Sequence, residues 1–72
     1  MTVLAVLRRK KGLTQAALAR SLGIPPQELS RLENGWLKRV RPDVEARLRQ
    51  LFGQEWTLDA LLQEPNPRPD AA

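Results

Sequence analysis

Apolar residues recur at helical spacing along the chain, and no stretch alternates between apolar and polar residues as a strand would. The clearest case is the segment from Thr14 to Gly35. Its apolar positions are Leu18, Leu22, Ile24, Leu29 and Leu32. A side chain larger than that of Ala19 would push two crossing helices apart, and a Cβ at Gly23 would oppose a left-handed turn between them. The segment therefore predicts two short helices joined at a steep angle by a tight turn.

Glycines fall where each helical pattern stops, and they divide the chain into five predicted helices. The first predicted helix covers residues 2–11, with Thr2 as N-cap, and the second follows an N-cap at Thr14. The third begins at Pro25 or Pro26, and the fourth covers residues 42–52. The fifth begins after an N-cap at Thr57 and is ended by Pro65. The last eight residues, PNPRPDAA, have no apolar anchor. The sequence thus predicts an all-α domain over residues 1–64 and a disordered tail over residues 65–72.

Composition excludes several classes of function. The chain has 72 residues, enough for one small domain, and it contains neither cysteine nor histidine. Disulfides, thiolate metal sites and the commonest general base are therefore absent. The longest apolar run, Val3 to Leu7, is too short for a membrane span or a signal peptide. We expect a soluble, cytoplasmic protein that has no metal or cofactor and is not an enzyme.

Positive charge flanks the predicted helix pair on both sides. Residues 1–20 carry five basic residues and no acid, and residues 36–50 carry five basic residues against two acidic ones. Residues 51–64 carry three acids and no base. Basic flanks fit a polyphosphate partner, but they fit solvated helix surfaces equally well.

The pattern LxxxR-x₃-GLTQ-x₂-LA-x₃-GI-x₄-LS-x-LENG runs from Leu4 to Gly35. With it, residues 4–63 resemble the lambda-repressor-like domain in its Cro/C1, or Xre, form. The resemblance implies a compact all-α fold of five helices, with the helix-turn-helix at the second and third. It also implies double-stranded DNA as the partner, bound by a homodimer at a palindromic operator.

In that family the outward side of the third helix lies in the major groove. The residues of this chain at those positions are Pro26, Gln27, Glu28, Ser30 and Arg31. Arg31 suits guanine and Gln27 suits adenine, each with discrimination of ~1–3 kcal/mol, although Arg31 could contact phosphate instead. Pro26 can offer only apolar contact, for instance to a thymine methyl. For Glu28 we favour capping of the helix N-terminus over acceptance from cytosine.

The resemblance also assigns contacts to the DNA backbone. Gln15, after the cap at Thr14, resembles the family's phosphate-binding glutamine, and the alternative is an exposed polar residue. The loop residues expected at phosphates are Asn34, Lys38, Arg39 and Arg41. Arg8 and Glu33 match a pair that commonly forms a partly buried salt bridge in phage repressor domains.

Two departures from the family pattern stand out. Pro25 and Pro26 replace the usual polar cap and a polar base reader. The loop from Gly35 to Asp43 is longer than the commonest form and carries Trp36. Trp36 could fill the core, stack on a sugar or contact a partner, and packing in the core or loop is the interpretation we favour.

The function expected is that of a sequence-specific DNA-binding regulator, most simply a small repressor. Its dimer surface would be the acidic, apolar fifth helix, with Trp56, and a regulatory protein partner is one route of control. The alternative is an interaction module, such as an antitoxin or adaptor, that keeps the fold without reading bases.

Overall fold

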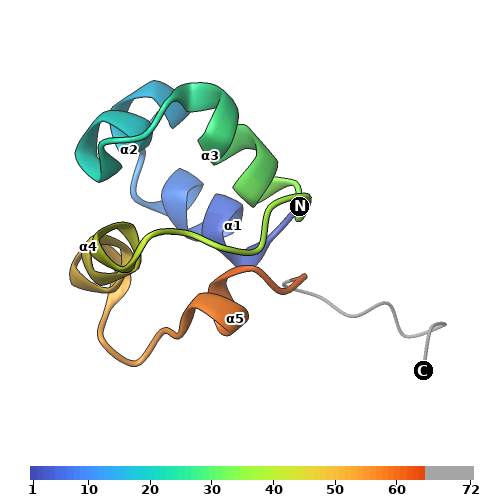
Figure 1. Cartoon of the computed structure of the whole chain (residues 1–72), viewed down its shortest axis with the longest axis vertical. Coiled ribbons are helices and arrows are strands. Elements are labelled where there is room, and N and C mark those ends of the chain that lie inside the picture. Colours follow the sequence, from blue (N-terminus) through green and yellow to red (C-terminus); the bar gives the residue numbers. More distant parts are fainter. Residues whose placement is uncertain (65–72) are drawn as a thin grey trace, which may run out of the picture.

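Helices account for most of the chain in the computed structural model, which describes residues 1–64 (Figure 1). They are α1 (Val3–Lys10), α2 (Gln15–Leu22), α3 (Pro26–Glu33), α4 (Pro42–Phe52) and α5 (Leu58–Leu61). No strand is present in this part of the chain. The predicted all-α fold with five helices is confirmed, whereas the predicted tail at 65–72 lies outside the described residues.

Three helices begin with a threonine cap, as predicted. The hydroxyl oxygens of Thr2, Thr14 and Thr57 each accept the backbone N–H three residues further along, at 3.4, 3.0 and 3.1 Å. A cap of this kind typically stabilises a helix by about 1 kcal/mol. The other two helices begin at Pro26 and Pro42 without a side-chain cap. Proline suits that position because the first N–H of a helix has no partner within it.

The turn between α2 and α3 depends on glycine. Gly23 ends α2 in the left-handed conformation, with φ of 71° and ψ of 31°. The next N–H, that of Ile24, bonds back to the carbonyl of Ala19 at 3.1 Å. Ala19 itself is only 1% exposed, so its small side chain lets α3 pack closely on α2. The predicted roles of both small residues are confirmed.

One apolar core connects all five helices. In Figure 1, α1 lies at the centre with α2 and α3 above it, α4 to the left and α5 below; α4 packs on α2 and α5 packs on α1. The buried core residues are Leu4, Leu18, Ala19, Leu22, Ile24, Leu29, Leu32, Val44, Leu48 and Leu61. This packing leaves the opposite faces of α2 and α3 to solvent, which positions the helix pair for contact with a partner.

The start of α1 joins the ends of two other helices. The N–H of Thr2 donates to the carbonyl of Glu33 at 3.1 Å, and the N–H of Val3 donates to the carbonyl of Gln63 at 2.8 Å. Helix α5 is one turn long and ends at Leu61 rather than reaching Pro65 as predicted. The Gln63 carbonyl accepts the N–H of Val3 in α1, and the Gln63 N–H donates to the carbonyl of Ala60, three residues back. Helix α1 ends one residue earlier than predicted.

Within residues 1–64, no helix combines the length and apolar character needed to cross a membrane. The same residues contain no group of acidic side chains arranged to hold a metal ion.

Candidate nucleic-acid interface

The outward face of α3 gathers the residues predicted to contact bases. Pro26, Gln27 and Arg31 are exposed, and Glu28 and Ser30 are half-buried. Gln27, Ser30 and Arg31 follow the spacing i, i+3, i+4, so they are neighbours on one helix surface. The opposite side of α3 is fixed in the core by Leu29 and Leu32. The helix therefore presents a polar surface whose orientation its buried side determines.

Glu28 does not form the capping hydrogen bond expected of it. Helix α3 has no side-chain cap, and its N-cap residue is Pro25. The Glu28 N–H instead donates to the Pro25 carbonyl at 3.0 Å. Pro25, at the cap position, offers no side-chain oxygen. The Glu28 carboxylate lies in the first turn of α3, where its negative charge complements the helix dipole.

The N-terminus of α2 has backbone N–H groups that point out of the helix. Thr14 accepts the N–H of Ala17, which leaves the N–H groups of Gln15 and Ala16 at the helix end without a partner inside the helix. Such a helix end attracts phosphate through its N–H groups and its dipole. The half-buried Gln15 side chain donates its Nε2–H to Glu33 Oε1 at 2.8 Å. This bond connects the start of α2 to the end of α3.

A buried ion pair lies beneath that connection. Arg8 Nε donates to Glu33 Oε2 at 2.6 Å and Arg8 Nη2 donates to Oε1 at 3.3 Å. Both side chains are deeply buried, at 9% and 4% exposure. The third nitrogen of Arg8 donates to the Leu13 carbonyl at 2.8 Å, just before α2. One guanidinium thus joins α1, the start of α2 and the end of α3, with the geometric specificity of a two-pronged contact.

The sequence did not indicate two members of this network: the bond from Gln15 to Glu33 and the carbonyl of Leu13. The sequence feature that could have indicated them is the GLTQ motif, in which Leu13 and Gln15 lie on either side of Thr14. Gln15 and Glu33 are 18 residues apart and meet through the packing of α2 on α3, whereas Arg8 and Leu13 are five residues apart and meet across the turn after α1.

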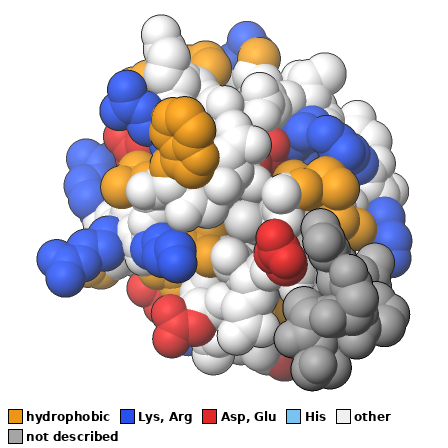
Figure 2. Space-filling model, turned by 90° about the vertical axis from the view of Figure 1, so that its right-hand side faces the viewer, with side chains coloured by type: hydrophobic (Ala, Val, Ile, Leu, Met, Phe, Trp, Pro, Cys, Tyr) orange, Lys and Arg blue, Asp and Glu red, His pale blue; other side chains and the backbone are white. Residues whose placement is uncertain are grey.

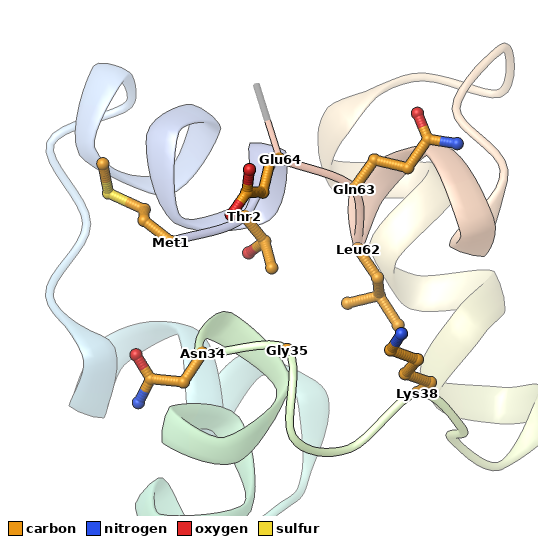
Figure 3. Close-up of a pocket in the computed structure, with 8 residues that line it drawn as sticks. All are labelled: Met1, Thr2, Asn34, Gly35, Lys38, Leu62, Gln63 and Glu64. Atoms are coloured by element: carbon orange, nitrogen blue, oxygen red, sulfur yellow. The ribbon is translucent and has the colours of Figure 1, made fainter. Parts of the chain in front are cut away.

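The loop after α3 carries the residues predicted at phosphates. Asn34, Lys38, Arg39 and Arg41 are all exposed. Figure 3 shows Asn34 at the end of α3 and Lys38 across a cavity of about 360 Å³, with the Lys38 side chain reaching toward Leu62. Arg41 Nε lies 3.4 Å from a carboxylate oxygen of Asp43, in an exposed pair. Arg39 forms no ion pair with any residue in the described part of the chain.

Comparison with known protein families accounts for this geometry. Residues 4–53, more than half of the chain, match the family model for the helix-turn-helix domain of the Cro/C1 type. The chain belongs to this family. It is therefore a DNA-binding regulator of transcription, and α2 with α3 is its helix-turn-helix. No match was found to a curated protein or to a solved structure.

The loop of the helix-turn-helix domain contradicts one sequence-based interpretation. Packing of Trp36 in the core or loop was expected, but its side chain is 83% exposed. Leu37 and Val40 pack against the core instead. The reason is the left-handed Gly35, at φ 78°, after which the N–H groups of Trp36 and Leu37 both bond to the Arg31 carbonyl. This tight reversal leaves Leu37 at the inward position and Trp36 outside.

The side of the helix-turn-helix domain that holds the N-terminus and the ends of α3 and α5 is drawn in Figure 2. Lys and Arg side chains lie along both edges of this face, and hydrophobic side chains reach the surface beside them. Acidic side chains lie mainly across the lower half.

The predicted dimer residue Trp56 is half-buried and, like its neighbours Leu58 and Leu62, packs against the core.

Proposed function

We propose that this helix-turn-helix domain is a small transcriptional repressor that binds a palindromic operator as a homodimer. The observation that carries the proposal is the polar surface on α3 formed by the exposed Gln27 and Arg31 with the half-buried Ser30 between them. Its other side is held rigidly by the core, and basic or anion-attracting groups lie before and after it. That arrangement suits a helix that enters the major groove between two backbone contacts.

Base recognition follows from the chemistry of each side chain on α3. The Arg31 fork matches the two acceptors of guanine, O6 and N7, and the Gln27 amide matches adenine N6 and N7. Each pair would contribute ~1–3 kcal/mol of discrimination against the wrong base. Ser30 can donate or accept. Pro26 offers an apolar surface for a thymine methyl, and Glu28 can accept from cytosine N4.

Backbone contacts would set the position of α3 in the groove. The N-terminus of α2, with Thr14 and Gln15, would contact one phosphate, and the residues of the loop would contact others: Asn34, Lys38, Arg39 and Arg41. Because Gln15 and Glu33 are hydrogen-bonded, the phosphate contact and the end of α3 keep a fixed spacing. Such contacts add affinity without sequence information.

The dimer would use the α5 side, away from the reading surface. Trp56, Leu58 and Leu62 are half-buried there, so each keeps part of its apolar surface available. The neighbouring acids Glu55 and Asp59 are exposed and would be repelled by DNA, which favours a protein contact on this side. Repression then needs only occupation of the operator, and control through a partner protein would act on that occupation.

A pair of substitutions tests base reading. With a duplex selected from random sequences, Arg31→Ala should reduce the preference for that duplex over unrelated DNA by about 10-fold. Arg39→Ala should instead weaken binding to all duplexes alike and lower the salt dependence by about one phosphate contact. Titrations at several salt concentrations separate the two effects. If neither substitution changes DNA affinity, the domain is an interaction module of the antitoxin or adaptor kind.

A further inference from the structure

Trp36 is the most exposed large hydrophobic residue in the described part of the chain, at 83%. An indole so exposed gains much from contact with a partner, because aromatic side chains bury large areas on binding. The position is also well defined. Gly35 turns the chain at the end of α3, and the Trp36 N–H donates to the Arg31 carbonyl at 2.9 Å. This is the hydrogen bond that closes a Schellman helix end.

The bond to Arg31 fixes Trp36 relative to the reading surface. In a Schellman end, the residue two positions past the cap returns beside the last full turn of the helix. Trp36 is therefore attached to the turn of α3 that carries Arg31. Leu37 and Val40 pack on the core and anchor the rest of the loop. If Arg31 contacts a base edge, Trp36 lies where the chain leaves the groove.

Charge identifies the surface that Trp36 fits. Three basic residues, Lys38, Arg39 and Arg41, follow it within five positions, and no acid lies between Trp36 and Asp43. The DNA backbone alternates anionic phosphates with apolar sugar faces, so it can satisfy the cations and the indole together. A protein partner would need an acidic surface around an apolar pocket to do the same.

We propose that Trp36 packs against a deoxyribose at the edge of the groove that α3 enters, as an apolar backbone contact beside the basic loop. The proposal rests on the DNA-reading function proposed above. It assigns Trp36 to affinity rather than to base choice, because sugars are the same at every step.

The test uses fluorescence and affinity together. A selected duplex should change the emission of the unaltered chain more than that of Trp36→Phe, and the difference, which reports Trp36, should be a quenching or blue shift that grows up to saturation. Trp36→Ala should bind selected and unrelated duplexes about 10-fold more weakly, the loss expected when one aromatic contact is removed. Its salt dependence should match that of the unaltered chain, because no phosphate contact is lost. Trp36→Phe should retain most of the affinity.

Two controls keep the result specific. Trp36→Phe, in which Trp56 is the single tryptophan, gives the emission change to subtract, and Trp36→Ala should melt at nearly the same temperature as the unaltered chain, since it removes an exposed side chain. Unchanged Trp36 emission at saturation, or full DNA affinity in Trp36→Ala, overturns the proposal for Trp36. If the unaltered chain still binds the selected duplex selectively, the proposed DNA-reading function stands in that case. Loss of self-association in Trp36→Ala without DNA assigns the residue to a protein interface and also overturns it. If the unaltered chain binds no duplex selectively, the proposed function and this proposal fail together.

Discussion

At the scale of single residues, the buried carboxylate of Glu33 organises the DNA-facing side of the domain. It accepts hydrogen bonds from Arg8 and from Gln15, so it joins the helix ends on which the proposed contacts depend. Its removal leaves Arg8 buried without a counter-charge, which is far more costly than the loss of an exposed ion pair.

Glu33→Gln should therefore lower the free energy of unfolding by about 3–5 kcal/mol. Urea denaturation at neutral pH measures this change. The matched control is Glu55→Gln, an exposed acid without an ion pair among the described residues, which should stay within about 0.5 kcal/mol of the unaltered chain. Equal losses in the two variants would show that Arg8 is not held by a buried charge.

Sequence reasoning at this scale succeeded for residues that obey local rules. The threonine caps and the buried leucines follow from hydrogen-bonding chemistry and helical spacing. The pair Arg8 and Glu33 was expected only from the resemblance, and the structure forms it. Trp36 was misplaced because composition favours burial of tryptophan, whereas the turn at Gly35 decides which loop side chain faces inward.

At the scale of elements, the angle between α2 and α3 depends on Gly23. A Cβ at this position would meet no atom within 4 Å, so the constraint is the positive φ and not space. Helix starts were predictable because a cap is a local signal. The end of α5 was not, since the segment after Leu61 bonds to the start of α1, where the Gln63 carbonyl accepts the N–H of Val3.

Gly23→Ala should consequently destabilise the domain by about 1–2 kcal/mol, the cost of placing an ordinary residue in the left-handed region. Gly23→Asn should cost less, because asparagine enters that region more readily. Thermal unfolding monitored by circular dichroism compares the two. Identical melting temperatures for all three chains would mean that the turn relaxes to another conformation.

At the scale of the whole molecule, the proposed contacts to bases and phosphates involve α2, α3 and the loop after α3, while α5 lies on the other side of α1 (Figure 1). This separation allows DNA and a second copy to be bound at once. Sedimentation with a selected duplex should give two chains per duplex. A strict one-to-one complex, together with a monomer at high concentration without DNA, would contradict the proposed homodimer.

The central claim is that α3 reads a DNA sequence, and selection from a pool of random duplexes tests it most directly. The bound fraction, sequenced after several rounds at physiological salt, should be enriched in two inverted half-sites whose centres lie about 10 base pairs apart. Each half-site should contain a guanine whose preference is lost in Arg31→Ala and an adenine whose preference is lost in Gln27→Ala. A bound fraction with the same base composition at every position as the starting pool would contradict the account.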